Sequence, residues 1–335
     1  MTTAQITTVL SSISDVERDT GIPKETLRVW ERRYAFPQPE RDSNGERLYP
    51  ADQVQRLRLV KRLLDTGYRP GKIMHHSTDE LAELAAKVAH AAPPPDAEDP
   101  ELKQCMQLLK EHKMPQLRQK LAQAQLQLGL RRFVIELVAP LTTLVGEVWA
   151  SGALAIFEEH LFAEMLQSVM RNAIFSANQQ LGQLDASPRI LLTTVPQERH
   201  GLGLLMAEAL FCLEGAHCVS LGVQTPLNDI VEAARLQKAD IVALSFSSSM
   251  SPRAAVDNVM ELQNRIGAGV TVWAGGSCAA LARRQLGANS VLDLNDIGGA
   301  ISRWRAQHGA GSASADSGTA SDTGAGTFAA VSVSA

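Results

Sequence analysis

The spacing of the apolar residues changes near residue 189, and this change constrains the fold more than any other feature of the chain. Between about residues 101 and 180, apolar residues recur every three to four positions, the period of a helix with one buried face. Two buried stripes are predicted in this way: Leu137, Leu141, Leu144 and Val148, then Leu154, Phe157, Leu161 and Met165. Helices of this length, four in number, are typical of a bundle.

Beyond residue 189, short apolar runs alternate with amphipathic helical stretches. The runs are Ile190–Leu192, Val219–Leu221, Ile241–Leu244, Val270–Trp273 and Val291–Leu292. This alternation predicts an α/β, Rossmann-like domain, in which an open parallel sheet is wrapped by helices and a ligand binds at the carboxyl ends of the strands. After Gln307 the chain consists mostly of Gly, Ala, Ser and Thr, which predicts a disordered tail.

A proline-rich segment at residues 91–100 is the clearest domain boundary, because three successive prolines form a semi-rigid spacer. With 335 residues, the chain is long enough for two or three domains. The predicted division is an N-terminal domain at 1–78, a linker at 79–100, a helical bundle at 101–183, the α/β domain at 184–308 and the tail at 309–335.

The sequence predicts a cytoplasmic protein that does not enter a membrane. No apolar run reaches the roughly 18 residues needed to cross a bilayer. Residues 1–10 lack the basic start and apolar core of a secretion signal. The net charge of −4 argues against general nucleic-acid binding by the whole chain, so charge is better considered segment by segment.

The four cysteines form no C-x-x-C pair: Cys105, Cys212, Cys218 and Cys278. Cys212 and Cys218 flank His217, so a metal site is one interpretation. The favoured interpretation is buried thiols without a metal, with Cys212 at the end of an apolar helix and Cys218 at the start of a strand.

Short helices and a β wing are predicted between residues 12 and 76. Ser14 and Glu17 have the spacing of a capping box, so a first helix is expected to begin at Ser14 and to end at Gly21. A second helix follows Pro23 and runs through Tyr34. The turn at 42–45 joins the two strands of the wing, and a third helix follows Pro50.

The second helix carries apolar residues on one face and arginines on the other. An arginine-bearing helix after a tight turn suits the major groove of DNA, and wing arginines can hold the flanking backbone. The alternative is a merely solvated face, since the segment has only 13 Lys/Arg against 10 Asp/Glu. The segment resembles the winged helix-turn-helix of MerR-family regulators over about 65 residues. The resemblance implies double-stranded operator DNA as partner and these contact residues: Arg28, Arg32, Arg33, Tyr34, Arg41, Arg47 and Tyr49.

A histidine follows the first predicted strand of the α/β domain, at the edge where a ligand would bind. Glu198, two residues before His200, can accept the second ring N–H of the histidine and raise the basicity of its other nitrogen. Gly203 lets a bulky group approach the next helix. A metal or cofactor is therefore expected near His200.

Three motifs at strand ends resemble those of cobalamin-binding domains: Glu198-x-His200-x-x-Gly203, Ser245-Phe246-Ser247 and Gly275-Gly276. The resemblance implies that His200 is the lower cobalt ligand. It also implies that the nucleotide tail enters a slot between the loops after the third and fourth strands. The chain departs from the family pattern in having Glu for Asp at 198 and Ser for Leu at 247. The second change is expected to make the tail slot more polar.

The bundle carries Trp149 followed after nine residues by Glu159-His160. This pattern resembles the W-x9-E-H motif of CarH/LitR-like photoreceptors, which are MerR-family cobalamin-binding repressors. The resemblance implies adenosylcobalamin as cofactor, with Trp149 against the adenosyl group and Glu159 bonded to its ribose. It assigns to His160 the cobalt position vacated when light breaks the Co–C bond, whereas His112, the other bundle histidine, is expected to be solvated.

Taken with this resemblance, the sequence predicts a light-responsive repressor rather than an enzyme. By resemblance it is a homotetramer that binds operator DNA in the dark and dissociates in light. A corrinoid methyltransferase or mutase needs a separate substrate domain, and a MerR-type metal sensor needs cysteines after its long helix. The remaining alternative is a repressor with the same fold that responds to a protein antagonist or to the cobalamin level.

Overall fold

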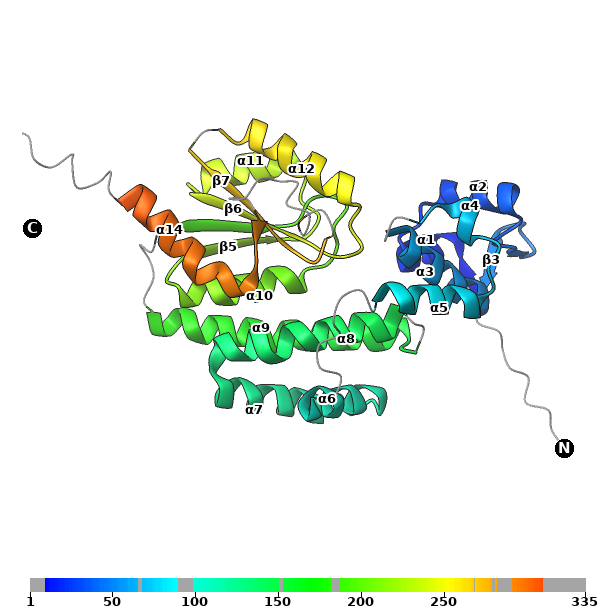
Figure 1. Cartoon of the computed structure of the whole chain (residues 1–335), viewed down its shortest axis with the longest axis horizontal. Coiled ribbons are helices and arrows are strands. Elements are labelled where there is room, and N and C mark those ends of the chain that lie inside the picture. The colour runs from blue at the N-terminus through cyan, green and yellow to red at the C-terminus, as the bar shows by residue number, and fades with distance from the viewer. Residues whose placement is uncertain are drawn as a thin grey trace, which may run out of the picture.

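The computed structural model describes residues 10–65, 68–89, 99–150, 153–181, 187–267, 269–278, 281 and 291–309. These residues form an N-terminal domain, a helical bundle and an α/β domain that lies along one side of the bundle (Figure 1). The predicted disordered tail lies outside the described residues, apart from Gly309, and so does the predicted proline spacer, apart from Asp99 and Pro100. Among the described residues, no helix is both long and apolar enough to span a membrane.

The N-terminal domain contains short helices and a small antiparallel sheet of order β1-β3-β2. Its elements are β1 (Leu10–Ser12), α1 (Ile13–Thr20), α2 (Lys24–Tyr34), β2 (Glu40–Arg41), β3 (Arg47–Pro50), α3 (Ala51–Asp65), α4 (Pro70–Ile73) and α5 (Thr78–Ala89). Strands β2 and β3 are the predicted wing. Strand β1 was not expected from the sequence and pairs with β3.

The N-cap of helix α1 lies two residues earlier than the sequence predicts, so the assignment of Ser14 to the capping box is wrong. The N-cap is Ser12, whose hydroxyl accepts a hydrogen bond from the Asp15 backbone N–H at 3.2 Å. The Asp15 carboxylate accepts one in return from the Ser12 N–H at 3.3 Å. Ser12 ends strand β1 opposite Leu48 and is therefore already extended, as an N-cap must be.

Helix α5 occupies the first half of the predicted linker at 79–100. It packs on α3, and its residues Leu81 and Ala85 are buried in the core of the N-terminal domain. This half of the segment is thus a helix packed within the N-terminal domain.

The bundle has the four predicted helices: α6 (Pro100–Lys110), α7 (Met114–Arg132), α8 (Ala139–Ala150) and α9 (Ile156–Leu181), with a π-helical turn at Phe133–Val138 between α7 and α8. The second predicted stripe is wrong, because Phe157 and Leu161 are exposed. The residues that α9 buries lie on another face: Phe162, Leu166, Val169, Met170 and Ala173. Leu154 is buried but precedes the helix, so it does not set the phase of α9.

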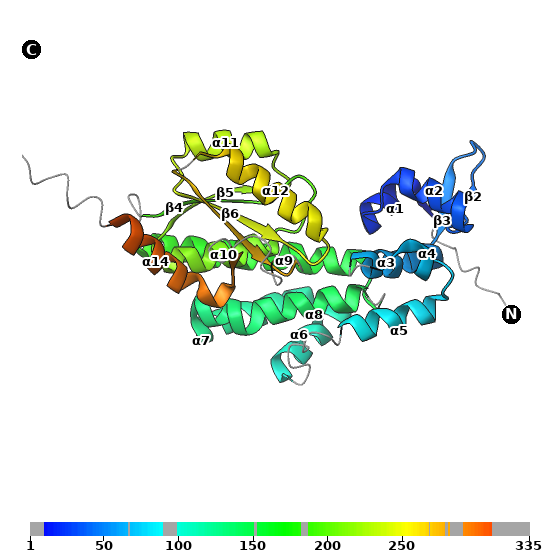
Figure 2. The same ribbon diagram turned by 45° about the horizontal axis from the view of Figure 1, so that its top comes forward.

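The α/β domain confirms all five predicted strands, which form a parallel sheet of order β5-β4-β6-β7-β8. Its elements are β4 (Arg189–Thr193), α10 (Leu202–Leu213), β5 (His217–Gly222), α11 (Leu227–Leu236), β6 (Ile241–Phe246), α12 (Pro252–Arg265), β7 (Thr271–Gly276), β8 (Val291–Leu292), a 3-10 turn (Leu294–Asp296) and α14 (Ile297–Gly309). Helices α10 and α14 cover the face toward the bundle, and α11 and α12 cover the other face (Figure 2).

The strand order reverses at β4, which lies between β5 and β6. In open α/β sheets a ligand binds beyond the carboxyl ends of the strands at such a point. The loops after β4 and β6 are therefore where a site is expected.

Candidate functional site

A buried carboxylate organises the loop that follows β4. The side chain of Glu198 accepts hydrogen bonds from His200 Nδ1 at 2.6 Å and from the His200 backbone N–H at 3.0 Å. It also accepts bonds from the Ser247 backbone N–H at 2.7 Å and from Ser247 Oγ at 2.9 Å. We call Glu198, His200 and Ser247 the histidine cluster.

The hydrogen bonds of the histidine cluster keep Glu198 ionised. Burial alone would raise the pKa of Glu198, but the hydrogen bond and the charge of His200 and the backbone donors oppose it, and the pKa falls below its usual range. An ionised Glu198 holds the proton of His200 on Nδ1, which leaves the lone pair of Nε2 for a metal. The His200 side chain is 51% exposed, and within the described residues Nε2 forms no hydrogen bond.

The sequence predicts that Ser247 makes the slot for the nucleotide tail more polar. In the structure, Ser247 instead belongs to the histidine cluster. Its Oγ lies 2.9 Å from Glu198 Oε2 and 3.0 Å from His200 Nδ1. Strands β4 and β6 are neighbours, so the residue after β6 lies beside the loop after β4. The hydroxyl at position 247 thus supports the carboxylate that orients His200.

We predict that Ser247→Ala lowers the stability of the protein by about 1 kcal/mol, because a buried carboxylate loses one of its donors. Cobalamin affinity should fall only a few-fold, since His200 and the other donors to Glu198 remain. Thermal unfolding and a cobalamin titration measure the two effects. Ser248→Ala, one residue further along the chain and exposed, is the matched control. Equal behaviour of the two variants would remove Ser247 from the cluster.

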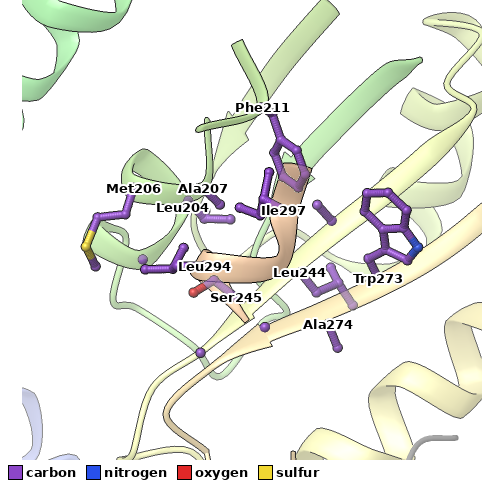
Figure 3. Close-up of a pocket in the computed structure, with 14 residues that line it drawn as sticks. Leu204, Met206, Ala207, Phe211, Leu244, Ser245, Trp273, Ala274, Leu294 and Ile297 are labelled. Carbon is purple, nitrogen blue, oxygen red and sulfur yellow. The ribbon is translucent and has the colours of Figure 1, made fainter. Parts of the chain in front are cut away.

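A pocket that is partly open to solvent lies on the bundle side of the sheet, at the ends of β6 and β7 (Figure 3). The predicted residues Gly203, Ser245, Gly275 and Gly276 line it. Ser245 is the next-to-last residue of β6, and the two glycines are the last two residues of β7, so none of the three follows its strand. The other lining residues are mostly apolar and were not predicted: Leu204, Met206, Ala207, Phe211, Ala243, Leu244, Trp273, Ala274, Leu294 and Ile297.

Two of the glycines are required by the close approach of neighbouring chain segments. A Cβ on Gly203 would lie 2.5 Å from Ser245 Oγ. Gly276 has a φ of +115°, and a Cβ there would overlap the backbone oxygen of Phe246. Side chains at these positions would displace the pocket walls, so the residues fit a bulky and largely apolar group that approaches the backbone closely.

Three predicted residues lie where α8 ends and α9 begins. The indole Nε1 of Trp149 is buried and has no hydrogen-bond partner among the described residues. Burial raises the pKa of Glu159, against the opposing charges of His160 and His200. Glu159 is therefore within electrostatic reach of His200, although the two come from different domains. His160 is exposed, with Nε2 3.6 Å from Glu159 Oε2.

His112 is not simply solvated, as the sequence predicted. Its Nε2 lies 2.7 Å from Glu158 Oε1, and its ring packs against Phe157. The pair links the turn before α7 to the first turn of α9. This turn of α9 also carries Glu159 and His160.

The residues present fit a cobalamin. The histidine cluster offers one oriented nitrogen for cobalt, and the pocket beside Gly203 and Ser245 can take the nucleotide tail. Trp149 and Glu159 lie on the bundle, where they can cover the other side of the cofactor. Among the described residues, no three His, Cys, Asp or Glu side chains converge to hold a metal ion by themselves. Within the described residues, the four cysteines form no disulfide bond.

The predicted DNA-reading residues lie on α2 and on the wing. Arg32 and Arg33 are exposed, and Arg28 is half-buried and paired with Glu25. The ring of Tyr34 contacts His75 and lies under the guanidinium of Arg33. On the wing, Arg41 donates a hydrogen bond to the Gly45 carbonyl at 2.8 Å.

Tyr49 cannot contact DNA in this fold, so its inclusion among the predicted contacts is wrong. Its side chain is 0% exposed in the core of the N-terminal domain, and burial raises its pKa. Arg47 is half-buried and pairs with Glu31 of α2 at 2.7 Å. Arg47 therefore ties the wing to α2.

Three segments of the chain match known protein families. Residues 11–78 match the MerR HTH family regulatory protein, and residues 101–173 and 188–295 match two B12 binding domain families. The described parallel sheet and the histidine cluster lie within residues 188–295, and so do all the pocket residues except Ile297.

Two transcriptional repressors of Myxococcus xanthus are similar over most of the chain. CarH is 29% identical over 263 residues, which are 77% of this chain and 86% of CarH. CarA is 27% identical over 245 residues, which are 72% of this chain and 77% of CarA. An enzyme, methionine synthase of Mycobacterium leprae, is 28% identical over 128 residues, which are 36% of this chain and only 10% of the enzyme. The two repressors are thus similar to this chain over most of its length, and the protein is a CarH-like, MerR-type, cobalamin-binding transcriptional repressor.

Proposed function

We propose that this repressor uses adenosylcobalamin as a chromophore, binds its operator in the dark and releases it in light. When bound, adenosylcobalamin supplies a cobalt–carbon bond that light breaks. The observation that carries the proposal is the histidine cluster, in which Glu198 accepts a hydrogen bond from His200 Nδ1 at 2.6 Å and leaves His200 Nε2 to bind cobalt. Trp149 and Glu159 of the bundle can cover the other side of the cofactor.

Each residue of the site has a distinct role in the proposal. His200 presents Nε2 as the lower ligand, held by Glu198. Trp149 and Glu159 cover the upper side, where a large adenosyl group fits better than a methyl group. Burial raises the pKa of Glu159, so its carboxyl group can donate a hydrogen bond to a ribose oxygen when protonated. His160, exposed beside Glu159, is the residue that can move toward the site after light.

The assembly belongs to the same proposal. In the dark the protein is a homotetramer, and four DNA-binding domains on one assembly bind an operator with several half-sites more tightly than one domain alone. Movement of His160 shifts α9 against the α/β domain. Such a shift breaks a subunit interface and releases the DNA.

The second candidate is a repressor of the same fold that responds to a protein antagonist or to the cobalamin level. The presence together of Trp149, Glu159, His160 and His200 favours the light-responsive form.

The test compares operator binding before and after green light. The probe is a DNA duplex selected from random sequences by repeated binding to the adenosylcobalamin-loaded protein in the dark. We expect light to lower operator affinity at least tenfold and to reduce the mass of the assembly in gel filtration. The cofactor-free protein and the protein loaded with cyanocobalamin, which has no alkyl ligand, are the controls. An affinity unchanged by light would support the second candidate.

A further inference from the structure

The loop that carries His200 also touches the N-terminal domain. Arg199, the residue next to His200, donates a hydrogen bond from Nη1 to the backbone carbonyl of Arg18 near the end of α1. Its other terminal nitrogen, Nη2, lies over Gly21, where an added Cβ would be 2.7 Å away. The last carbonyls of a helix lack partners within the helix, and a cation is favoured at this end. Arg199 thus satisfies the end of α1 from another domain.

A second arginine, on the N-terminal domain, contacts the helical bundle. Arg58 of α3 places its guanidinium carbon 6.0 Å from the centre of the Trp149 ring, which is within the range of a cation–π contact. Asp19 of α1 holds this guanidinium with hydrogen bonds of 2.8 to 3.2 Å. The Arg58 and Asp19 side chains are only 15% and 8% exposed, so the arginine has a fixed position.

The two contacts lie on one surface of the N-terminal domain, formed by the end of α1 and by α3. We call this surface, with Arg199 and Trp149 opposite it, the docking contact. Both views show α1 on the side of the domain that faces the α/β domain, and α2 and the wing farther from it (Figures 1 and 2). The docking contact therefore leaves Arg32 and Arg33 exposed for DNA.

We propose that the docking contact couples the cofactor site to the orientation of the DNA-reading helix. On the cofactor side, the contact consists of Trp149 and Arg199. Trp149 belongs to the upper side of the cofactor site, and Arg199 adjoins His200 on the lower side. A bound cobalamin holds both residues in place and so fixes the surface on which the N-terminal domain docks. The inference rests on the proposed cobalamin site, and it adds a path within one chain that does not require a change in assembly.

The experiment measures the distance between the domains. Spin labels are placed on Ser43→Cys in the wing turn and Asn264→Cys in α12, both exposed positions. Labelling of the protein without these substitutions shows whether the native thiols react. The labelled protein is mixed with an excess of unlabelled protein, so that an assembly contains at most one labelled subunit. We then expect one narrow distance distribution in the cobalamin-loaded protein in the dark, and a broader one without cobalamin. Arg199→Ala should broaden the distribution in both states and abolish its narrowing by cobalamin. Because the coupling is reciprocal, cobalamin affinity should fall by the factor by which cobalamin favours docking, while the absorption spectrum of the bound cofactor stays that of wild type.

Arg18→Ala is the matched control, because it removes an exposed arginine at the same contact but keeps the backbone carbonyl that Arg199 uses. We expect it to behave as wild type. Arg58→Ala alone would leave Asp19 buried without its partner and can unfold the domain. The double variant Asp19→Ala/Arg58→Ala removes both charges and is expected to broaden the distribution as Arg199→Ala does.

The proposal that the domains dock through this contact is wrong if Arg199→Ala and the double variant both keep the wild-type distance distribution. This outcome is distinct from a failure of the proposed function. If the wild type does not bind cobalamin, the proposed cofactor role fails, but the comparison of wild type with Arg199→Ala without cofactor still decides whether the domains dock through Arg199.

Discussion

Replacement of His200 by Ala is expected to weaken cobalamin binding about 100-fold. The variant loses the nitrogen that Glu198 orients, and loss of groups that merely orient a metal ligand already costs 10–100-fold in affinity. The protein should still fold, because the His200 side chain is 51% exposed and contributes little to the core. Titration with adenosylcobalamin, followed by its absorption spectrum, measures the affinity and reports whether a histidine nitrogen binds cobalt.

His217→Ala is the control for this experiment. His217 begins β5, so it lies at the amino edge of the sheet, away from the strand ends that form the site. Its loss should leave the titration and the spectrum unchanged. Wild-type affinity together with a wild-type spectrum in His200→Ala would show that another group binds the lower side of the cofactor.

Replacement of Arg28 or Arg32 by Ala is expected to weaken operator binding by about 1–3 kcal/mol each. Both arginines are on α2, and a guanidinium that bonds a base or a phosphate is not replaced by water without loss. In a variant that loses a phosphate contact, the slope of the logarithm of the binding constant against the logarithm of the salt concentration should also decrease in magnitude by about one. Fluorescence anisotropy with the selected duplex, over a series of salt concentrations, measures both quantities.

Arg253→Ala provides the comparison, since Arg253 is exposed on α12 of the α/β domain. Its removal should change neither the affinity nor the salt dependence. If Arg28→Ala and Arg32→Ala bind as wild type does over the whole salt series, the DNA-reading surface is not on α2.

Much of the fold follows from the sequence because the relevant signals are local. The change of period near residue 189 predicts the parallel sheet, and each apolar run from Ile190 to Leu292 is a strand. Glu198 and His200 fall in one loop and Gly203 in the first turn of the helix that follows it, so their proximity needs no tertiary information. The same holds for Trp149, Glu159 and His160, which lie on either side of one short connection.

The wrong predictions depend on contacts between distant residues. Ser12 caps α1 because β1 pairs with β3, and no local pattern shows this pairing. The resemblance implies a DNA contact for Tyr49, but its side chain is buried in a core to which residues from Val16 to Ala85 contribute, and no local pattern shows that packing. The bond of Ser247 to Glu198 joins residues 49 positions apart and follows only from the pairing of β4 with β6.

The ion pair between Arg47 and Glu31 has a consequence for the DNA itself. It joins strand β3 of the wing to helix α2, so the distance between the arginines of the wing and those of α2 is fixed. A fixed distance between these arginines favours duplexes whose groove width already matches it. Duplexes whose grooves must be compressed or widened bind less tightly, because their deformation costs free energy. Selectivity among operators can thus arise at base pairs that no side chain touches, through the stiffness and width of the double helix.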